Sequence, residues 1–138
     1  MKTIANVKNI NPGKYYIILG ANLEYNDQTY YEMGEKIFTN KFYSSIEEAK
    51  ENLLDYIYQN FGWLELNMIE SWYWDSSDIE ENIFIKAFLE DNNINYIRDC
   101  ELSISNLIDF VKIFGKSNQE ILEILPSGYA SIYEIELS

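Results

Sequence analysis

The side chains of this sequence best able to do chemistry are carboxylates, and they are concentrated in its middle. The interval between Lys50 and Lys86 holds eight acidic residues and no basic one. These acids are Glu51, Asp55, Glu65, Glu70, Asp75, Asp78, Glu80 and Glu81. Carboxylates gathered without counter-charges attract metal ions or the Lys and Arg side chains of another protein. The interval is therefore the first candidate binding surface of the chain.

The charge of the chain is divided unevenly along its length. The 138 residues include 10 Lys and Arg against 23 Asp and Glu, a net charge of −13. Residues 1–46 sum to +1, residues 47–101 to −11 and residues 102–138 to −3. Neutralising phosphates requires basic patches, so direct binding to nucleic acid or to an anionic membrane is disfavoured. We expect a basic protein as the partner instead.

Three acids lie four residues apart in a segment with a helical pattern. On a helix Glu47, Glu51 and Asp55 share one face, about 6 Å apart along the axis. Each like-charged pair destabilises a helix by about 0.2–0.5 kcal/mol, without an obvious gain for folding. Two interpretations stay open. The row is either a solvated face, with Glu47 and Glu48 favoured by the helix dipole, or a surface that presents carboxylates where a basic protein expects phosphates.

The acidic interval also contains three consecutive aromatic residues, Trp72-Tyr73-Trp74. Three neighbours cannot all face one way on a helix or a strand, so we expect at least one at the surface. There it would anchor an Arg- or Lys-rich partner inside an acidic rim. The alternative is that only Tyr73 is exposed. The predicted partner-binding residues are Glu47, Glu51, Asp55, Glu65, Glu70, Trp72, Tyr73, Trp74, Asp75, Asp78, Glu80 and Glu81.

Catalytic groups are few. The chain has no histidine, which excludes Ser-His and Cys-His pairs and imidazole zinc sites. Its one cysteine, Cys100, is expected to be a small buried hydrophobe. The six glycines lack the spacing of a phosphate or dinucleotide loop, and Asp75, Asp78 and Glu80 lack the glycine of a calcium loop. A two-carboxylate glycosidase needs no histidine, so the residue types present do not exclude it, but no pair of acids stands out in the sequence. We expect no enzyme, no cofactor and no metal.

The N-terminal part of the chain has strand patterns. Residues rich in Tyr and Ile predict strands over Lys14–Tyr25, Thr29–Met33 and Lys36–Thr39. Turn residues at Asn26-Asp27-Gln28 and at Gly34 separate them. We expect an antiparallel β-meander.

A helix is predicted after this meander and a strand after the helix. Ser45 and Glu48 form the pattern of a capping box, and the helix ends near Gly62. The apolar stripe of this helix consists of Ile46, Ala49, Leu53 and Ile57. Over Trp63–Met68, apolar residues alternate with polar ones, which predicts a half-buried strand.

The C-terminal half is mainly helical in pattern. A second helix is predicted over Ile79–Asp91, capped by Ser77 with Glu80 or by Asp78 with Glu81. A third runs from Ser103 to Gly115. After it, a short fourth helix capped by Ser117 and a closing hairpin are both open, and we favour a final strand from Tyr129.

This order of elements predicts one α+β domain over residues 1–138. It has an N-terminal antiparallel meander, two to four helices in the middle and C-terminal half, and a closing C-terminal strand. A single cysteine, a polar N-terminus and short apolar runs predict a soluble cytoplasmic protein. Twenty isoleucines and fifteen asparagines against one arginine indicate an AT-rich genome, that of a low-GC bacterium or its phage.

In composition, size and lack of recognisable catalytic groups, the chain is similar to phage-encoded anti-CRISPR and anti-restriction proteins. The resemblance is a profile of the whole chain and rests on no motif. It implies a non-enzymatic inhibitor that masks the basic nucleic-acid-binding surface of a host nuclease complex, as a DNA mimic does. The alternatives are an immunity protein against a basic nuclease toxin and a small regulatory interaction domain. Homodimerisation through the tyrosine-rich N-terminal sheet is also open.

Overall fold

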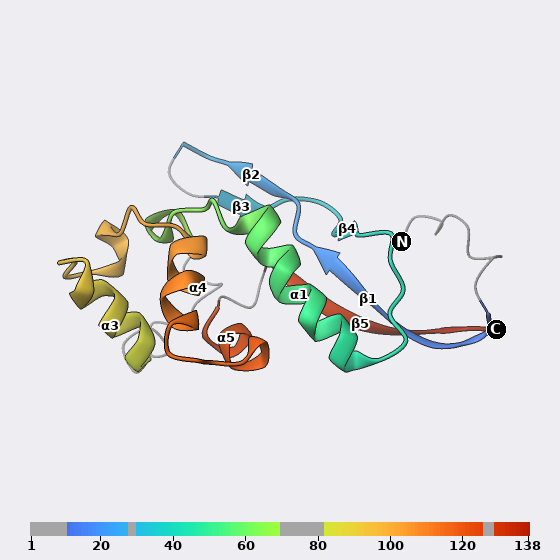
Figure 1. Cartoon of the computed structure of the whole chain (residues 1–138). Helices are drawn as coiled ribbons and strands as arrows, with labels where there is room; N and C mark the ends of the chain where they lie inside the picture. The colour runs from blue at the N-terminus through green and yellow to red at the C-terminus, as the bar shows by residue number, and fades with distance from the viewer. Residues whose placement is uncertain (1–10, 28–29, 70–81, 126–128) are drawn as a thin grey trace.

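The computed structural model describes residues 11–27, 30–69, 82–125 and 129–138 (Figure 1). The strands are β1 (Gly13–Gly20), β2 (Leu23–Tyr25), β3 (Tyr30–Glu32), β4 (Ile37–Phe38) and β5 (Ala130–Leu137). The helices are α1 (Ile46–Phe61), α3 (Ile83–Asp91), α4 (Ile104–Lys112) and α5 (Asn118–Ile124), with 3-10 turns η2 (Leu66–Met68) and η3 (Ile97–Asp99). The predicted α+β domain, with N-terminal strands, helices and a closing strand, is confirmed.

The main sheet joins the two ends of the described chain. β5 pairs antiparallel with β1 along its whole length, from Gly13 opposite Leu137 to Gly20 opposite Ala130. β4 pairs with the other side of β1, so the strand order is β4-β1-β5. β2 and β3 form a separate antiparallel hairpin. The N-terminal strands are thus antiparallel as predicted but belong to two sheets, and the strand predicted over Lys14–Tyr25 is interrupted between β1 and β2.

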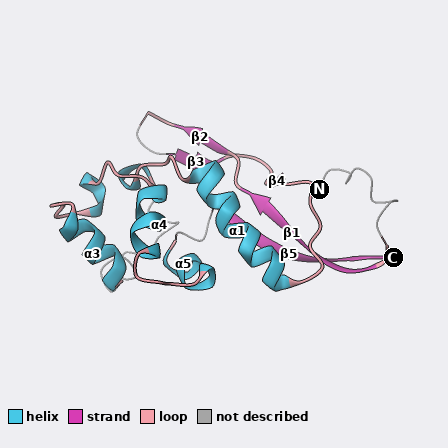
Figure 2. Ribbon diagram, viewed as in Figure 1, coloured by secondary structure: helices cyan, strands magenta, loops and turns pink. Residues whose placement is uncertain are grey.

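Helix α1 lies across β1 and β5 and also packs against α4 and α5 (Figure 2). Its start is as predicted, because the Ser45 hydroxyl accepts a hydrogen bond from the Glu48 N–H (3.2 Å). Of the predicted apolar stripe Ile46 alone is exposed, since it occupies the first position of the helix. The buried side of α1 consists of Ala49, Leu53, Leu54, Ile57 and Phe61.

The segment Trp63–Met68 corrects one prediction, because it is not a regular strand. Leu64 and Leu66 are buried, as the alternating pattern predicted. The backbone instead forms η2, in which the Met68 N–H donates to the Glu65 carbonyl (3.0 Å). Main-chain hydrogen bonds join the segment to the residues before α4, from the Leu66 N–H to the Leu102 carbonyl (2.9 Å) and from the Ile104 N–H to the Leu64 carbonyl (2.9 Å). They form an isolated bridge between Glu65 and Ser103 instead of a continuous ladder. A 3-10 turn and an isolated bridge thus replace a regular strand while the same side chains are buried.

The starts of the remaining helices are set by side-chain caps. Helix α3 begins at Ile83, four residues later than predicted, because the extended Asn82 caps it through its side-chain oxygen. The predicted caps of this helix lie outside the described residues. Ser103 caps α4, and Ser117 caps α5. A short helix followed by a strand, rather than a hairpin, therefore ends the chain.

Among the helices that the structure describes, none has both the length and the apolar character needed to cross a bilayer.

The core predicts a contrast between two isoleucines, one in the middle of α4 and one at its C-terminal end. Ile108 is fully buried, whereas Ile113, the C-cap residue, is 80% exposed. We expect Ile108→Ala to lower the free energy of unfolding by about 2–5 kcal/mol, through lost burial and a cavity. Ile113→Ala should change it by less than about 0.5 kcal/mol. Urea unfolding followed by circular dichroism measures both, and equal effects would contradict this packing.

Candidate functional site

Helix α1 carries a row of exposed carboxylates on its outer side. Glu47, Glu51 and Asp55 are all exposed, and each lies about one turn from the next. At a rise of about 1.5 Å per residue the row extends for about 12 Å. The structure therefore places these three predicted residues together on one solvent-facing surface, which we call the acidic row.

The acidic row has no counter-ion in the described part of the chain. Ion pairs there join Lys14 to Glu134 (3.6 Å), Lys36 to Glu32 (3.0 Å) and Lys116 to Glu120 (3.5 Å), and none includes a residue of the row. Lys50, on the same helix, lies on the side that turns toward β5 and α5. The row therefore presents its full negative charge to solvent.

The charge on α1 also acts on a neighbouring phenol. The pKa of Tyr43 is raised, first by burial and then by the negative charges of Glu48 and Asp55. Both effects favour the neutral phenol. Tyr43 therefore stays protonated and adds no negative charge to that of these acids.

Side-chain contacts fix the position of α1 relative to α4. The Tyr58 hydroxyl donates to both carboxylate oxygens of Asp109, at 3.2 and 3.1 Å. This hydrogen bond to Asp109 is the main cause of a raised pKa at Tyr58. The ammonium group of Lys112 lies 5.4 Å from the centre of the Tyr58 ring. The helix that bears the acidic row thus packs against its neighbours through its buried side and is hydrogen-bonded to α4 through its flank.

The other predicted site residues do not join the row in the described structure. Glu65 lies beyond the end of α1, is half-buried and forms the bridge with Ser103. The rest lie outside the described residues: Glu70, Trp72, Tyr73, Trp74, Asp75, Asp78, Glu80 and Glu81. Their part in a site stays a prediction.

Cys100 is built into the core rather than into a site. Its side chain is fully buried. The pKa of its thiol is raised by burial, and the negative charge of Glu65 raises it further. Both effects hold the thiol in its protonated, non-nucleophilic form. Among the described residues, no group of three His, Cys, Asp or Glu side chains could hold a metal ion.

An exposed aromatic cluster was missed in the sequence. Tyr25 and Tyr30 pair across the β2–β3 hairpin with ring centres 4.9 Å apart, and Trp63 contacts Tyr30 edge-on at 5.0 Å. Tyr25 is 46% and Trp63 is 54% exposed. The two tyrosines flank the predicted turn, so their pairing could have been inferred. The contact with Trp63 depends on tertiary folding.

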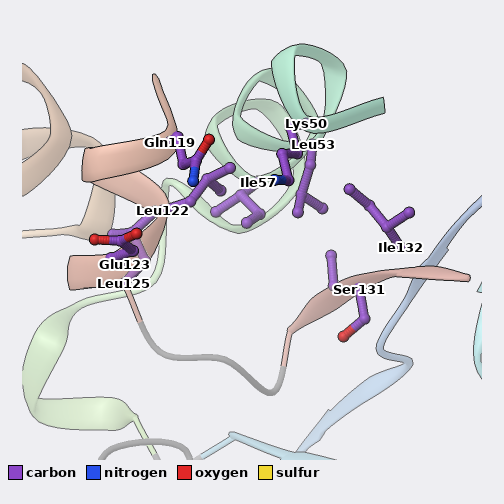
Figure 3. A pocket seen from close by; sticks show the side chains of 10 residues that line it. Lys50, Leu53, Ile57, Gln119, Leu122, Glu123, Leu125, Ser131 and Ile132 are labelled. Atoms are coloured by element: carbon purple, nitrogen blue, oxygen red, sulfur yellow. The ribbon is translucent and has the colours of Figure 1, made fainter. Parts of the chain in front are cut away.

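A groove also lies between α1, α5 and β5 (Figure 3). Its volume is about 390 Å³, and it is open to solvent. Apolar side chains form most of it, while Lys50, Gln119 and Glu123 supply polar groups from the two helices. Its apolar lining is Leu53, Ile57, Leu122, Leu125, Ala130 and Ile132. Nothing in the sequence pattern places these three elements around one opening.

The state of Cys100 predicts slow reaction with a thiol reagent. In the folded chain at neutral pH we expect little labelling by dithionitrobenzoate, and a rate that rises only at a higher pH than for an ordinary thiol, because the pKa is raised. The same chain in urea is the control and should label rapidly. Rapid labelling of the folded chain at neutral pH would contradict the buried, protonated thiol.

The described residues thus offer the acidic row on α1, the aromatic cluster around Tyr30 and the groove beside β5 as candidate binding surfaces. Comparison of the chain with protein-family models, with curated proteins and with solved structures finds no match. The function must therefore be inferred from these surfaces.

Proposed function

We propose that this protein is a non-enzymatic acidic inhibitor that binds and masks a basic, nucleic-acid-binding surface of a nuclease complex in a bacterial host cell. Its role would be phage anti-defence, directed against a CRISPR or restriction system. The observation that carries the proposal is the acidic row on α1, which is exposed and has no ion-pair partner in the described structure. A folding role would favour pairing these acids with lysines.

The position of the row favours binding. Helix α1 is 16 residues long, and five of its side chains are buried. Its flank is tied to α4 by the hydrogen bond from Tyr58 to Asp109. Charges on such a support need little ordering when a partner arrives, so less free energy of association is lost.

The spacing of the row indicates how closely it can imitate DNA. Its charges are about 6 Å apart along the helix axis, whereas one strand of B-DNA carries a phosphate about every 3.4 Å along its axis. The row therefore has about half the linear charge density of one strand. We infer that it attracts and covers a basic surface rather than tracing the path of a bound strand.

Charge and aromatic contacts would contribute differently to binding, the first to the association rate and the second to the affinity. The net charge of −13 steers a basic partner and speeds association, while desolvated aromatic anchors usually provide most of the affinity. Tyr25 and Trp63 are exposed aromatic candidates for this role. The run Trp72-Tyr73-Trp74 is a second candidate, outside the described residues.

Two triple variants of equal net charge test the proposal. One neutralises the row (Glu47→Gln, Glu51→Gln, Asp55→Asn), and its control neutralises three other exposed acids (Glu90→Gln, Asp91→Asn, Asp99→Asn). The chain is expressed in strains with an active CRISPR or restriction system, and the plating of a targeted phage is measured. We expect the native chain and the control to protect the phage, and the row variant to lose protection. Its association with the purified nuclease complex should slow by about tenfold.

The outcomes separate the row from total charge. Equal inhibition by both variants would contradict a role for the row, and equal loss in both would show that only net charge matters. No protection by the native chain in any such strain would contradict the anti-defence role. Both variants should unfold within about 0.5 kcal/mol of the native chain, because the altered acids are exposed. A third variant, reversing the charges of Glu70, Asp75 and Asp78, tests the acidic segment outside the described residues.

A further inference from the structure

In the described part of the chain, strand β5 is an edge strand of the main sheet. In the order β4-β1-β5 it lies at the side of the sheet, and on its outer side no strand pairs with it in the described residues (Figure 1). The strand is eight residues long and contains neither a proline nor a lysine, two residues that often protect such edges. A free edge of this length is able to accept a further strand.

The hydrogen-bond pattern shows which residues of β5 face outward. Tyr16 on β1 exchanges two main-chain hydrogen bonds with Tyr43, both 2.8 Å, on the side away from β5. Because successive residues direct these groups to opposite sides, the odd-numbered residues of β1 face β5. The Ala21 N–H, which donates to the Tyr129 carbonyl (2.7 Å), agrees with this. From the register, the outward main-chain groups on β5 belong to Ala130, Ile132, Glu134 and Glu136.

The side chains of these four residues all lie on the face of the sheet toward α1, because side chains alternate along a strand. Ala130 and Ile132 line the groove between α1, α5 and β5, and Figure 3 shows Ile132 between the strand and α1. Glu134 and Glu136 are exposed further along. Lys14 is the nearby base, 3.6 Å from Glu134. Along this edge, the outward residues are therefore two apolar ones, Ala130 and Ile132, followed by two acidic ones, Glu134 and Glu136.

We propose that the free edge of β5 receives an extended basic segment of the partner protein as an additional antiparallel strand. Its main chain would bond to the outward groups of β5, as in other cases of strand addition. Its apolar side chains would enter the groove beside Ala130 and Ile132, and its Lys or Arg side chains would lie beside Glu134 and Glu136. The inference rests on the proposed function, because the same basic partner supplies the strand.

Charge favours such a segment over a second copy of this chain. Pairing β5 with itself would bring two more glutamates to an edge that already holds Glu134 and Glu136. Both copies would carry a net charge of −13. Like charges across neighbouring strands are destabilising, whereas opposite charges there contribute favourably. A segment with lysines at these positions is therefore the matching occupant.

An octapeptide is the probe for this edge. The sequence Lys-Thr-Lys-Thr-Val-Thr-Val-Thr places its lysines opposite Glu136 and Glu134 and its valines opposite Ile132 and Ala130 in an antiparallel pairing. Its control has Glu in place of both Lys. In titrations of the full chain followed by amide chemical shifts, we expect the first peptide to shift the outward amides of β5 and to slow their hydrogen exchange. The control peptide should do neither.

Two substitutions at one position separate the main chain from the side chain. Glu134→Pro removes the outward N–H, while Glu134→Ala keeps it, and both lose the contacts of the carboxylate with Lys14 and Tyr16. We expect the proline variant to bind the lysine peptide about tenfold more weakly than the alanine variant. Circular dichroism checks the fold of each. If the proline variant fails to fold, the test is hydrogen exchange in the native chain, where the lysine peptide should slow exchange at the amides of Ile132 and Glu136.

Equal binding by the two folded variants, or unchanged exchange at these amides with the lysine peptide, would overturn the proposal. Equal binding of the Glu peptide would overturn the charge argument, and self-association through β5 in sedimentation would indicate a second copy. The phage assay separates this test from that of the proposed function. If the acidic-row variant loses inhibition while the peptide leaves β5 unaffected, the edge proposal fails and the proposed function stands. If the peptide binds but the native chain protects no phage, the proposed function fails and the edge proposal stands.

Discussion

The pairing of β1 with β5 is the interaction on which the rest of the structure depends. It brings together residues near the two ends of the chain, in a register that runs for eight residue pairs. Closing so long a loop has an entropic cost that local structure cannot offset, so burial has to do so. Helix α1 supplies that burial by covering the pair, and Phe61 stacks on Tyr129 at its end, with ring centres 5.3 Å apart. The same pairing leaves β4 and β5 as the two edges of the sheet.

This arrangement explains how a strongly acidic chain presents charge without losing its core. In the described residues the core consists of apolar residues, tyrosines and one cysteine, and holds no buried charged residue. The acids of α1 are therefore placed on the side away from the sheet, where solvent screens their repulsion. Along one face of strand β5, the side chains within the groove are apolar and those beyond it are acidic. Both surfaces suit a partner that carries positive charge.

Local signals accounted for most of the fold. The caps at Ser45, Ser103 and Ser117 set helix starts, because each cap depends only on residues three apart. Burial of Leu66 also followed from alternation, but the backbone there is a 3-10 turn, since alternation indicates which side chains are buried and not how the backbone is hydrogen-bonded. The acidic row followed from helical spacing alone. The sequence pattern did not predict the groove, the free edge or the position of Trp63, because these depend on contacts between distant segments.

In the proposed function, complementary charge brings this protein to a basic partner. The salt dependence of its association rate with the proposed nuclease-complex partner tests this directly, measured by surface plasmon resonance with the full chain. Steered association slows steeply as salt is added, because screening shortens the range of the field. We expect a steep fall in the association rate as salt is added, with a much smaller change in the dissociation rate. An association rate that does not depend on salt would contradict it.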